Sequence, residues 1–105
     1  MTGIIICHHS LARELQDTAY GILGQKEDLF AFSNTKITTE DLIHQIRDLI
    51  EKQGNPEHIV FMVDIRGGNC WAVARLLSRS QPGYYVLSGV NLPMIFSFLT
   101  KRGET

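Results

Sequence analysis

The sequence lacks the features that mark membrane-spanning, secreted and nucleic-acid-binding proteins. Its apolar runs are only a few residues long, whereas a helix that crosses a bilayer needs about 20 apolar residues. The stretch Met1-Thr2-Gly3 has neither the basic start nor the apolar core of a secretion signal. Lys and Arg number 10 against 11 Asp and Glu, without a basic block interleaved with aromatic residues. We therefore expect no membrane span and no nucleic acid partner.

Cysteine is also scarce. Two cysteines do not make the disulfide framework of a small secreted domain, and the simplest compartment for them is a reducing cytosol. We therefore predict a cytoplasmic protein. A chain of 105 residues buries roughly two thirds of its unfolded surface on folding, without help from metals or disulfides. We accordingly expect residues 1–105 to form one domain.

Short apolar strands alternate with amphipathic segments of helical spacing. The strands are predicted at Gly3–Cys7, Leu29–Phe32, Ile59–Val63 and Tyr84–Leu87. The helices are predicted at Leu11–Leu23, from Thr38 to near Gly54, at Cys70–Arg79 and from Pro93 to Leu99, with Ser10, Thr38 and Asn69 as caps. In the first helix the apolar residues at helical spacing are Leu11, Leu15, Ala19, Ile22 and Leu23. This alternation predicts an open flavodoxin-like α/β fold, with a parallel sheet of strand order 2-1-3-4 and helices on both faces.

Polar side chains follow the two strands that this order places side by side. Gly3–Cys7 runs directly into His8 and His9, and Asp64 directly follows Ile59–Val63. Ligands of open α/β sheets bind beyond the carboxyl ends of such strands. If Asp64 accepts a hydrogen bond from one ring nitrogen of His8, the other nitrogen is free as a base or nucleophile. The simpler alternative is that Asp64 only caps the turn that follows it.

A pair of glycines opens the next predicted helix. Backbone N–H groups at Gly67 and Gly68 can approach an anion closely, and the dipole of the following helix favours negative charge there. Arg66 either binds the oxygens of such an anion or faces solvent. A nucleophilic histidine, an orienting acid and an anion site together indicate a histidine that carries a phosphoryl group.

Three motifs make the chain similar to a known family. They are Gly-Ile-Ile-Ile-x-His-x-x-Leu-Ala from Gly3, Val-Asp-x-x-Gly-Gly from Val63, and Gly-Val-Asn-Leu-Pro-Met from Gly89. With these motifs the chain resembles enzyme IIA of the mannose class of the bacterial sugar phosphotransferase system, from about Gly3 to Leu99. The resemblance implies a cytoplasmic phosphocarrier. Such a carrier takes a phosphoryl group from the histidine phosphocarrier protein and passes it to a IIB domain.

The resemblance also implies roles for individual residues. His8 is the phosphoryl acceptor, Asp64 is the acid that hydrogen-bonds its ring, and the phosphate loop is Gly67, Gly68 and Asn69. No metal or other cofactor is implied, because the bond transferred is already reactive. Some family members exchange a strand between subunits, so a homodimer is also implied. The sugar is not readable from this chain.

This chain departs from the family pattern at several positions near the site. His9 replaces the usual Gly, and it is either a bystander, a contact for a partner, or the acceptor if the alignment shifts by one residue. Cys7 replaces a common Thr, and the segment Asn69–Ala72 replaces Ser-Pro-Phe-Asn. Trp71 either docks a partner protein together with Arg66 or packs its helix against the sheet.

Two alternative functions remain open at the level of sequence. One is a regulatory protein that is phosphorylated on His8 but signals to a regulator instead of a permease. The other is a metal-binding module that uses Cys7, His8 and Cys70, although their spacing matches no closed zinc motif. A disulfide between the two cysteines is disfavoured by a reducing cytosol.

Overall fold

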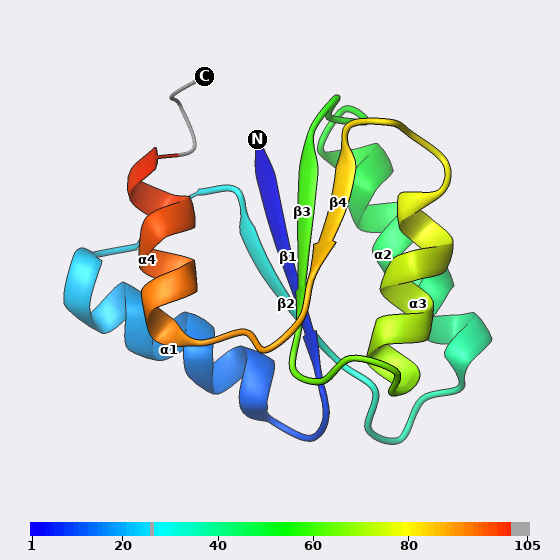
Figure 1. The fold of residues 1–105 in the computed structure, drawn as a ribbon, viewed down its shortest axis with the longest axis horizontal. Helices are drawn as coiled ribbons and strands as arrows, with labels where there is room; N and C mark the ends of the chain where they lie inside the picture. Colours follow the sequence, from blue (N-terminus) through cyan, green and yellow to red (C-terminus); the bar gives the residue numbers. More distant parts are fainter. Residues whose placement is uncertain (26, 102–105) are drawn as a thin grey trace.

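The computed structural model describes residues 1–25 and 27–101, the last of these by its backbone only. The strands are β1 (Thr2–Cys7), β2 (Leu29–Ser33), β3 (Ile59–Val63) and β4 (Tyr84–Leu87). The helices are α1 (Leu11–Leu23), α2 (Thr39–Lys52), α3 (Asn69–Ser78) and α4 (Leu92–Lys101). The four strands form one parallel sheet in the order β2-β1-β3-β4 (Figure 1). The predicted fold class and strand order are confirmed.

A hydrophobic core covers each face of the sheet, because successive side chains of the central strands point to opposite faces. Figure 1 shows α1 and α4 on one side of the sheet and α2 and α3 on the other. Ile4 and Ile6 of β1 belong to the core under α2 and α3, while Ile5 and Cys7 belong to the core under α1 and α4. Every residue of β1 is buried. Burial on both faces explains the continuous apolar run that β1 contains in the sequence.

Helix α2 begins as predicted. The Thr38 side-chain oxygen accepts a hydrogen bond from the Asp41 N–H at 3.0 Å, which satisfies one of the free N–H groups of the first turn. Ser10 stands at the corresponding position before α1, but its side chain makes no capping hydrogen bond. The sequence therefore identified both N-cap positions, but only Thr38 makes a capping hydrogen bond with its side chain.

The predicted cap of α3 is wrong by one residue. Gly68 is the N-cap, and Asn69 is the first residue of the helix. The Asn69 side-chain oxygen accepts a hydrogen bond from the Thr39 hydroxyl at 3.3 Å instead of capping its own helix. The sequence analysis also missed the cap of α4, where the Asn91 side-chain oxygen accepts from the Met94 N–H at 2.9 Å.

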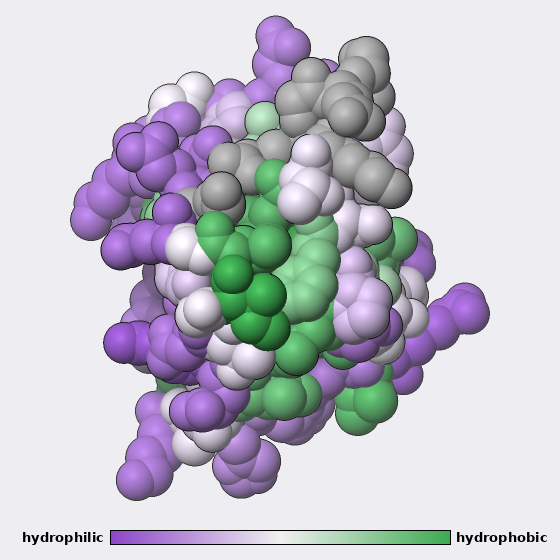
Figure 2. Space-filling view, turned by 90° about the vertical axis from the view of Figure 1, so that its left-hand side faces the viewer, coloured by the Kyte–Doolittle hydropathy of each residue, from purple (hydrophilic) through white to green (hydrophobic). Residues whose placement is uncertain are grey.

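The fully buried side chains of helix α1 are small, and larger ones such as Leu15 and Leu23 pack beside them against the core. Ala12 and Ala19 are buried, whereas Leu11 and Ile22 are 41% and 62% exposed. Of the residues predicted at helical spacing, Ala19 is buried and Leu15 and Leu23 pack against the core, whereas Leu11 and Ile22 face solvent. The buried Ala12 was not among the predicted residues. Figure 2 shows an apolar patch on the face of the molecule formed by α1 and α4.

The longest helix in the part of the chain that the structure describes has 14 residues. No helix among these residues is both long and apolar enough to cross a membrane.

Candidate functional site

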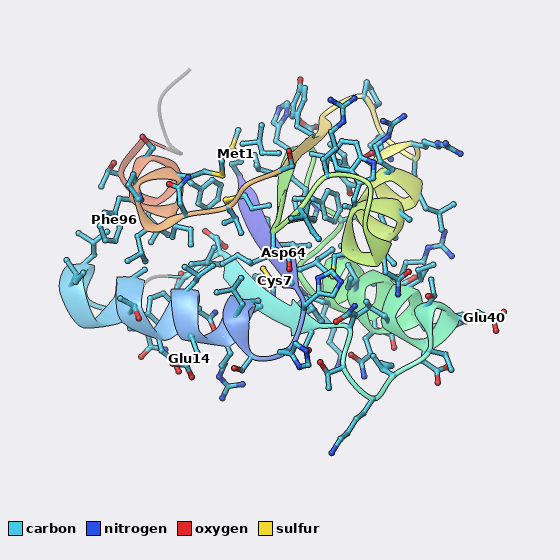
Figure 3. The ribbon with its side chains drawn as sticks, turned by 60° about the horizontal axis from the view of Figure 1, so that its bottom comes forward. Met1, Cys7, Glu14, Glu40, Asp64 and Phe96 are labelled. Carbon is cyan, nitrogen blue, oxygen red and sulfur yellow. The ribbon has the colours of Figure 1, made fainter. Side chains whose placement is uncertain are left out.

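The carboxyl ends of β1 and β3 meet at one edge of the sheet. Ile6 lies beside Val63 in the parallel register, so the chain leaves both strands at the same level. His8 directly follows β1 and Asp64 directly follows β3. Figure 3 shows Cys7 and Asp64 next to each other at this edge, between α1 and the α2–α3 layer. The structure therefore brings together the two residues that the sequence analysis paired.

Asp64 binds His8 twice through one oxygen. Asp64 Oδ2 accepts from the His8 backbone N–H at 2.9 Å, and it lies 2.7 Å from His8 Nδ1. The other oxygen, Oδ1, accepts from the Ile65 N–H at 2.9 Å. The sequence could not reveal these two backbone hydrogen bonds, because every residue except proline carries an N–H group that could donate one.

The charge state of Asp64 follows from these contacts. Burial raises the pKa of this carboxyl, but hydrogen bonds from the His8 backbone, the His8 ring and the Ile65 backbone outweigh burial and hold the pKa below its ordinary value. An ionised carboxylate only accepts hydrogen bonds, so we assign the ring hydrogen to His8 Nδ1. In the neutral ring, Nε2 then carries the free lone pair. The His8 side chain is 38% exposed and that of Asp64 12%.

Of the two glycines, Gly68 lies against the imidazole ring of His8, whereas a Cβ at Gly67 would meet no atom within 4 Å. Gly67 has a φ of +85°, a left-handed conformation that favours glycine, and Gly68 forms the N-cap of α3. A Cβ added to Gly68 would lie 3.5 Å from His8 Cε1 and 3.4 Å from Ile65 Cγ1. The free N–H groups of the first turn of α3 therefore begin next to the imidazole ring of His8.

Arg66 and Trp71 contact each other. The Arg66 guanidinium carbon lies 5.6 Å from the centroid of the Trp71 ring, and that of Arg75 lies 5.5 Å from it. Both distances are within the range of cation–π attraction. Trp71 is also half-buried against the core under α2 and α3. Trp71 thus packs its helix against the core, and its ring also contacts the guanidinium groups of Arg66 and Arg75.

His9 adopts a left-handed backbone conformation with a φ of +52°. This conformation costs a residue with a side chain roughly 1–2 kcal/mol and costs glycine little. This backbone conformation therefore favours glycine at the position of His9. The His9 side chain is exposed beside His8.

The two cysteines belong to different faces of the sheet. Cys7 is in the core under α1 and α4, and Cys70 is in the core under α2 and α3; both are free thiols. Burial, followed by the nearby Asp64 charge, raises the pKa of Cys7 to about 12 and that of Cys70 to about 11. Cys70 Sγ lies 3.9 Å from His8 Nδ1.

The metal-ligand set that the sequence left as an alternative, Cys7, His8 and Cys70, therefore changes in one member. Among the residues that the structure describes, the metal-ligating atoms that gather within 4.8 Å of one another are those of His8, Asp64 and Cys70. Cys7 is not among them.

Comparisons with known proteins agree with this geometry. Residues 3–105 match the model of the family EIIA-man, described as PTS system fructose IIA component. The mannose-specific EIIAB component of Escherichia coli (strain K12) is 28% identical over 102 residues, which are 96% of this chain and 32% of that protein. YadI of the same strain, named as a candidate phosphotransferase enzyme IIA component, is also 28% identical, over 94% of this chain and 68% of its own. The chain thus spans about one third of one relative and two thirds of the other.

Solved structures share the fold. The phosphotransferase system component EIIA from Streptococcus agalactiae superposes with a TM-score of 0.86 at 21% identity, covering 99% of this chain and 80% of that one. The mannose/sorbose-specific IIA subunit from Enterococcus faecalis gives a TM-score of 0.78 at 19% identity, covering 91% and 73%.

Proposed function

The chain belongs to the EIIA-man family of the sugar phosphotransferase system, and on that basis we propose that it is a phosphocarrier that acts through His8. Residues 1–105 form one IIA-type domain in this proposal. It accepts a phosphoryl group from the histidine phosphocarrier protein and passes it to a IIB domain. The observation that carries the proposal is the partly buried 2.7 Å contact between His8 Nδ1 and Asp64 Oδ2 at the carboxyl ends of β1 and β3.

The transfer step follows from the proposed position of the ring hydrogen. The Nε2 lone pair of His8 attacks the phosphorus of the donor phosphohistidine, and the P–N bond of the donor breaks as the new one forms. Phosphorylation at Nε2 leaves the Nδ1 hydrogen in place, so positive charge develops on the ring. The Asp64 carboxylate stabilises that charge through a charge-assisted hydrogen bond. Transfer to a IIB domain repeats the step with His8 as the donor.

The loop after Asp64 is suited to the phosphoryl oxygens. Gly67 and Gly68 carry no side chain that could block the backbone, and α3 begins at Asn69. We assign the phosphate cradle to the N–H groups of Gly67, Gly68 and Asn69. Arg66 adds a positive charge to this loop while its guanidinium stacks on Trp71.

A docking surface for the partner proteins surrounds the reactive ring. His9 is exposed, and Ile65 is 57% exposed directly after Asp64. An apolar side chain next to a reactive group is suited to a transient protein interface, as are aromatic residues and arginine. We therefore assign partner contacts to His9, Ile65 and Trp71; the sequence analysis had not singled out Ile65.

The family also supplies the setting for this proposal. We place the carrier in the cytoplasm, where its phosphoryl donor acts, and propose that it assembles as a homodimer. No metal or nucleotide takes part in the transfer, because the P–N bond is already reactive.

The deciding experiment is phosphorylation in a purified system. The chain is incubated with enzyme I, the histidine phosphocarrier protein and phosphoenolpyruvate, and its intact mass is measured. We expect the mass of one acid-labile phosphoryl group on the unaltered chain and on His9→Ala, but not on His8→Ala. His9→Ala is the matched control, because it removes the neighbouring imidazole. Modification of His8→Ala would show that the assigned acceptor is wrong.

A further inference from the structure

Three side chains that can bind a metal ion lie close together, and the phosphoryl-accepting histidine is one of them. Only two of the three take part in the proposed phosphoryl transfer. The three are His8, Asp64 and Cys70, each from a different segment of the chain. The third, Cys70, has no role in the transfer step. We propose that a thiophilic divalent cation such as Zn²⁺ binds these three residues and prevents His8 from accepting a phosphoryl group.

One distance between the ligand atoms is already close to that of a tetrahedral site, and another is shorter than it. With metal–ligand bonds of about 2.0–2.3 Å, neighbouring ligand atoms are about 3.3–3.8 Å apart. Cys70 Sγ is already 3.9 Å from His8 Nδ1. The 2.7 Å separation of His8 Nδ1 and Asp64 Oδ2 must widen, which a small rotation of the imidazole provides. Water can fill the fourth position, because the His8 side chain is 38% exposed.

The chemistry of the ligands matches a borderline-soft ion. An imidazole, a carboxylate and a thiolate are the three ligand types that zinc binds in proteins, and a thiolate excludes Mg²⁺ and Ca²⁺ as preferred occupants. Binding releases the thiol proton of Cys70 to solvent. His8 stays neutral: its hydrogen leaves Nδ1 and the ring takes the tautomer with the hydrogen on Nε2.

This tautomer is the reason that the ion blocks transfer. Neutral imidazole carries one hydrogen, so a ring that binds metal through Nδ1 has no lone pair on Nε2. The nucleophile of the proposed phosphoryl transfer is then absent. Metal binding itself stands independently of the proposed function, whereas the inhibition rests on it.

Cys7 provides a matched control within the same chain. It is a buried free thiol like Cys70, but it packs into the core on the other face of the sheet and is not part of the ligand cluster. Removal of either thiol leaves a similar small cavity. Only the removal of Cys70 removes a ligand.

The direct test is titration of the purified chain with Co²⁺, followed by absorption spectroscopy. We expect one bound ion per chain, with d–d bands of a tetrahedral site and a thiolate-to-cobalt charge-transfer band. Cys70→Ala should lose the charge-transfer band and bind at least tenfold more weakly, while Cys7→Ala keeps both properties. Asp64→Asn should keep the charge-transfer band and bind at least tenfold more weakly.

The proposal is wrong if excess Co²⁺ produces no charge-transfer band with the unaltered chain, or if Cys70→Ala keeps that band. A second measurement needs no variant: Zn²⁺ should slow the alkylation of Cys70 but not that of Cys7 in mild denaturant, read by peptide mass mapping. Equal protection of both thiols would also overturn the site.

The inhibitory role is tested with isolated phosphorylated histidine phosphocarrier protein as the donor. Zn²⁺ should abolish transfer to the unaltered chain but not to Cys70→Ala, and a chelator should restore it. Transfer that proceeds with Zn²⁺ bound would disprove the block. A chain that binds Co²⁺ as expected but accepts no phosphoryl group without metal would disprove the proposed function and leave the metal site intact.

Discussion

The carboxylate of Asp64 fixes the position of His8. One oxygen holds the His8 backbone and ring together, and the other is held by the Ile65 N–H. The ring therefore has its orientation set before a partner arrives. In the proposed phosphoryl transfer, this preorganisation lowers the free energy of the transition state, because fewer groups must reorient.

Replacement of Asp64 by Asn should slow phosphoryl transfer without preventing it. A hydrogen bond to a charged group contributes about 1.5–3 kcal/mol, which corresponds to a rate lower by roughly 10- to 100-fold. The measurement is a time course of intact mass with a fixed amount of phosphorylated donor. Asp48→Asn, on the exposed side of α2, serves as the control and should transfer at the rate of the unaltered chain. Equal transfer rates for the two variants would show that Asp64 does not contribute to phosphoryl transfer.

The depressed pKa of Asp64 also predicts a dependence of stability on pH. Burial raises this pKa, but the hydrogen bonds from His8 and Ile65 bring it below its ordinary value of 3.8. A group with a lowered folded-state pKa stabilises the fold above its unfolded-state pKa, and this stability is lost as pH falls through the folded-state value. The urea midpoint of the unaltered chain should therefore exceed that of Asp64→Asn at neutral pH and approach it below pH 3.8. A constant difference down to about pH 2 would contradict the assignment.

The sequence predicted that His8 and Asp64 lie together, but not the contacts that surround them. The adjacency of His8 and Asp64 follows from strand order, because parallel neighbours end at the same edge of the sheet. The approach of Cys70 to His8 depends on how α3 is rotated, which no periodicity specifies to within an ångström. The contact of Arg66 with Trp71 likewise depends on side-chain conformations that only the folded loop defines.

At the scale of elements, the helix starts differ in how they are stabilised. Thr38 makes a capping hydrogen bond to the Asp41 N–H, and Ser10 makes none. Thr38→Ala should therefore lower the free energy of unfolding by about 0.5–2 kcal/mol, while Ser10→Ala should cost clearly less. Urea denaturation of the two variants measures the difference. A larger loss from Ser10→Ala than from Thr38→Ala would show that the caps are assigned wrongly.

The elements themselves were largely predictable from the sequence. Strands and helices were found because apolar spacing changes from continuous runs to helical periodicity along the chain. The start of α3 was missed by one residue, since Asn69 is a better capping residue than Gly68 by propensity but bonds to Thr39 of another helix. Long-range contacts of this kind override local preference.

At the scale of the whole molecule, one strand joins two cores. Phe61 and Met62 are neighbours in β3, fully buried on opposite faces of the sheet. Loss of packing on either face therefore disturbs a strand that both faces share. This arrangement predicts that the two cores unfold together.

Met62→Ala should lower the free energy of unfolding by about 2–5 kcal/mol. Its effect should be equal whether unfolding is followed by far-UV circular dichroism or by Trp71 fluorescence, although Trp71 packs against the opposite core. Leu76→Ala, at a residue 41% exposed on α3, is the control and should cost much less. Separate midpoints for the two signals would indicate two independently folding layers.

The register between β1 and β3 has a consequence for how this chain can vary. His8 and Asp64 each follow immediately on a strand whose side chains alternate between two buried faces. Deleting a single residue from β1 would exchange the faces to which its side chains point. It would also move the His8 imidazole about 3.3 Å along the strand, away from Asp64. If His8 acts as proposed, the lengths of β1 and β3 are therefore fixed by the need to keep its imidazole within reach of Asp64.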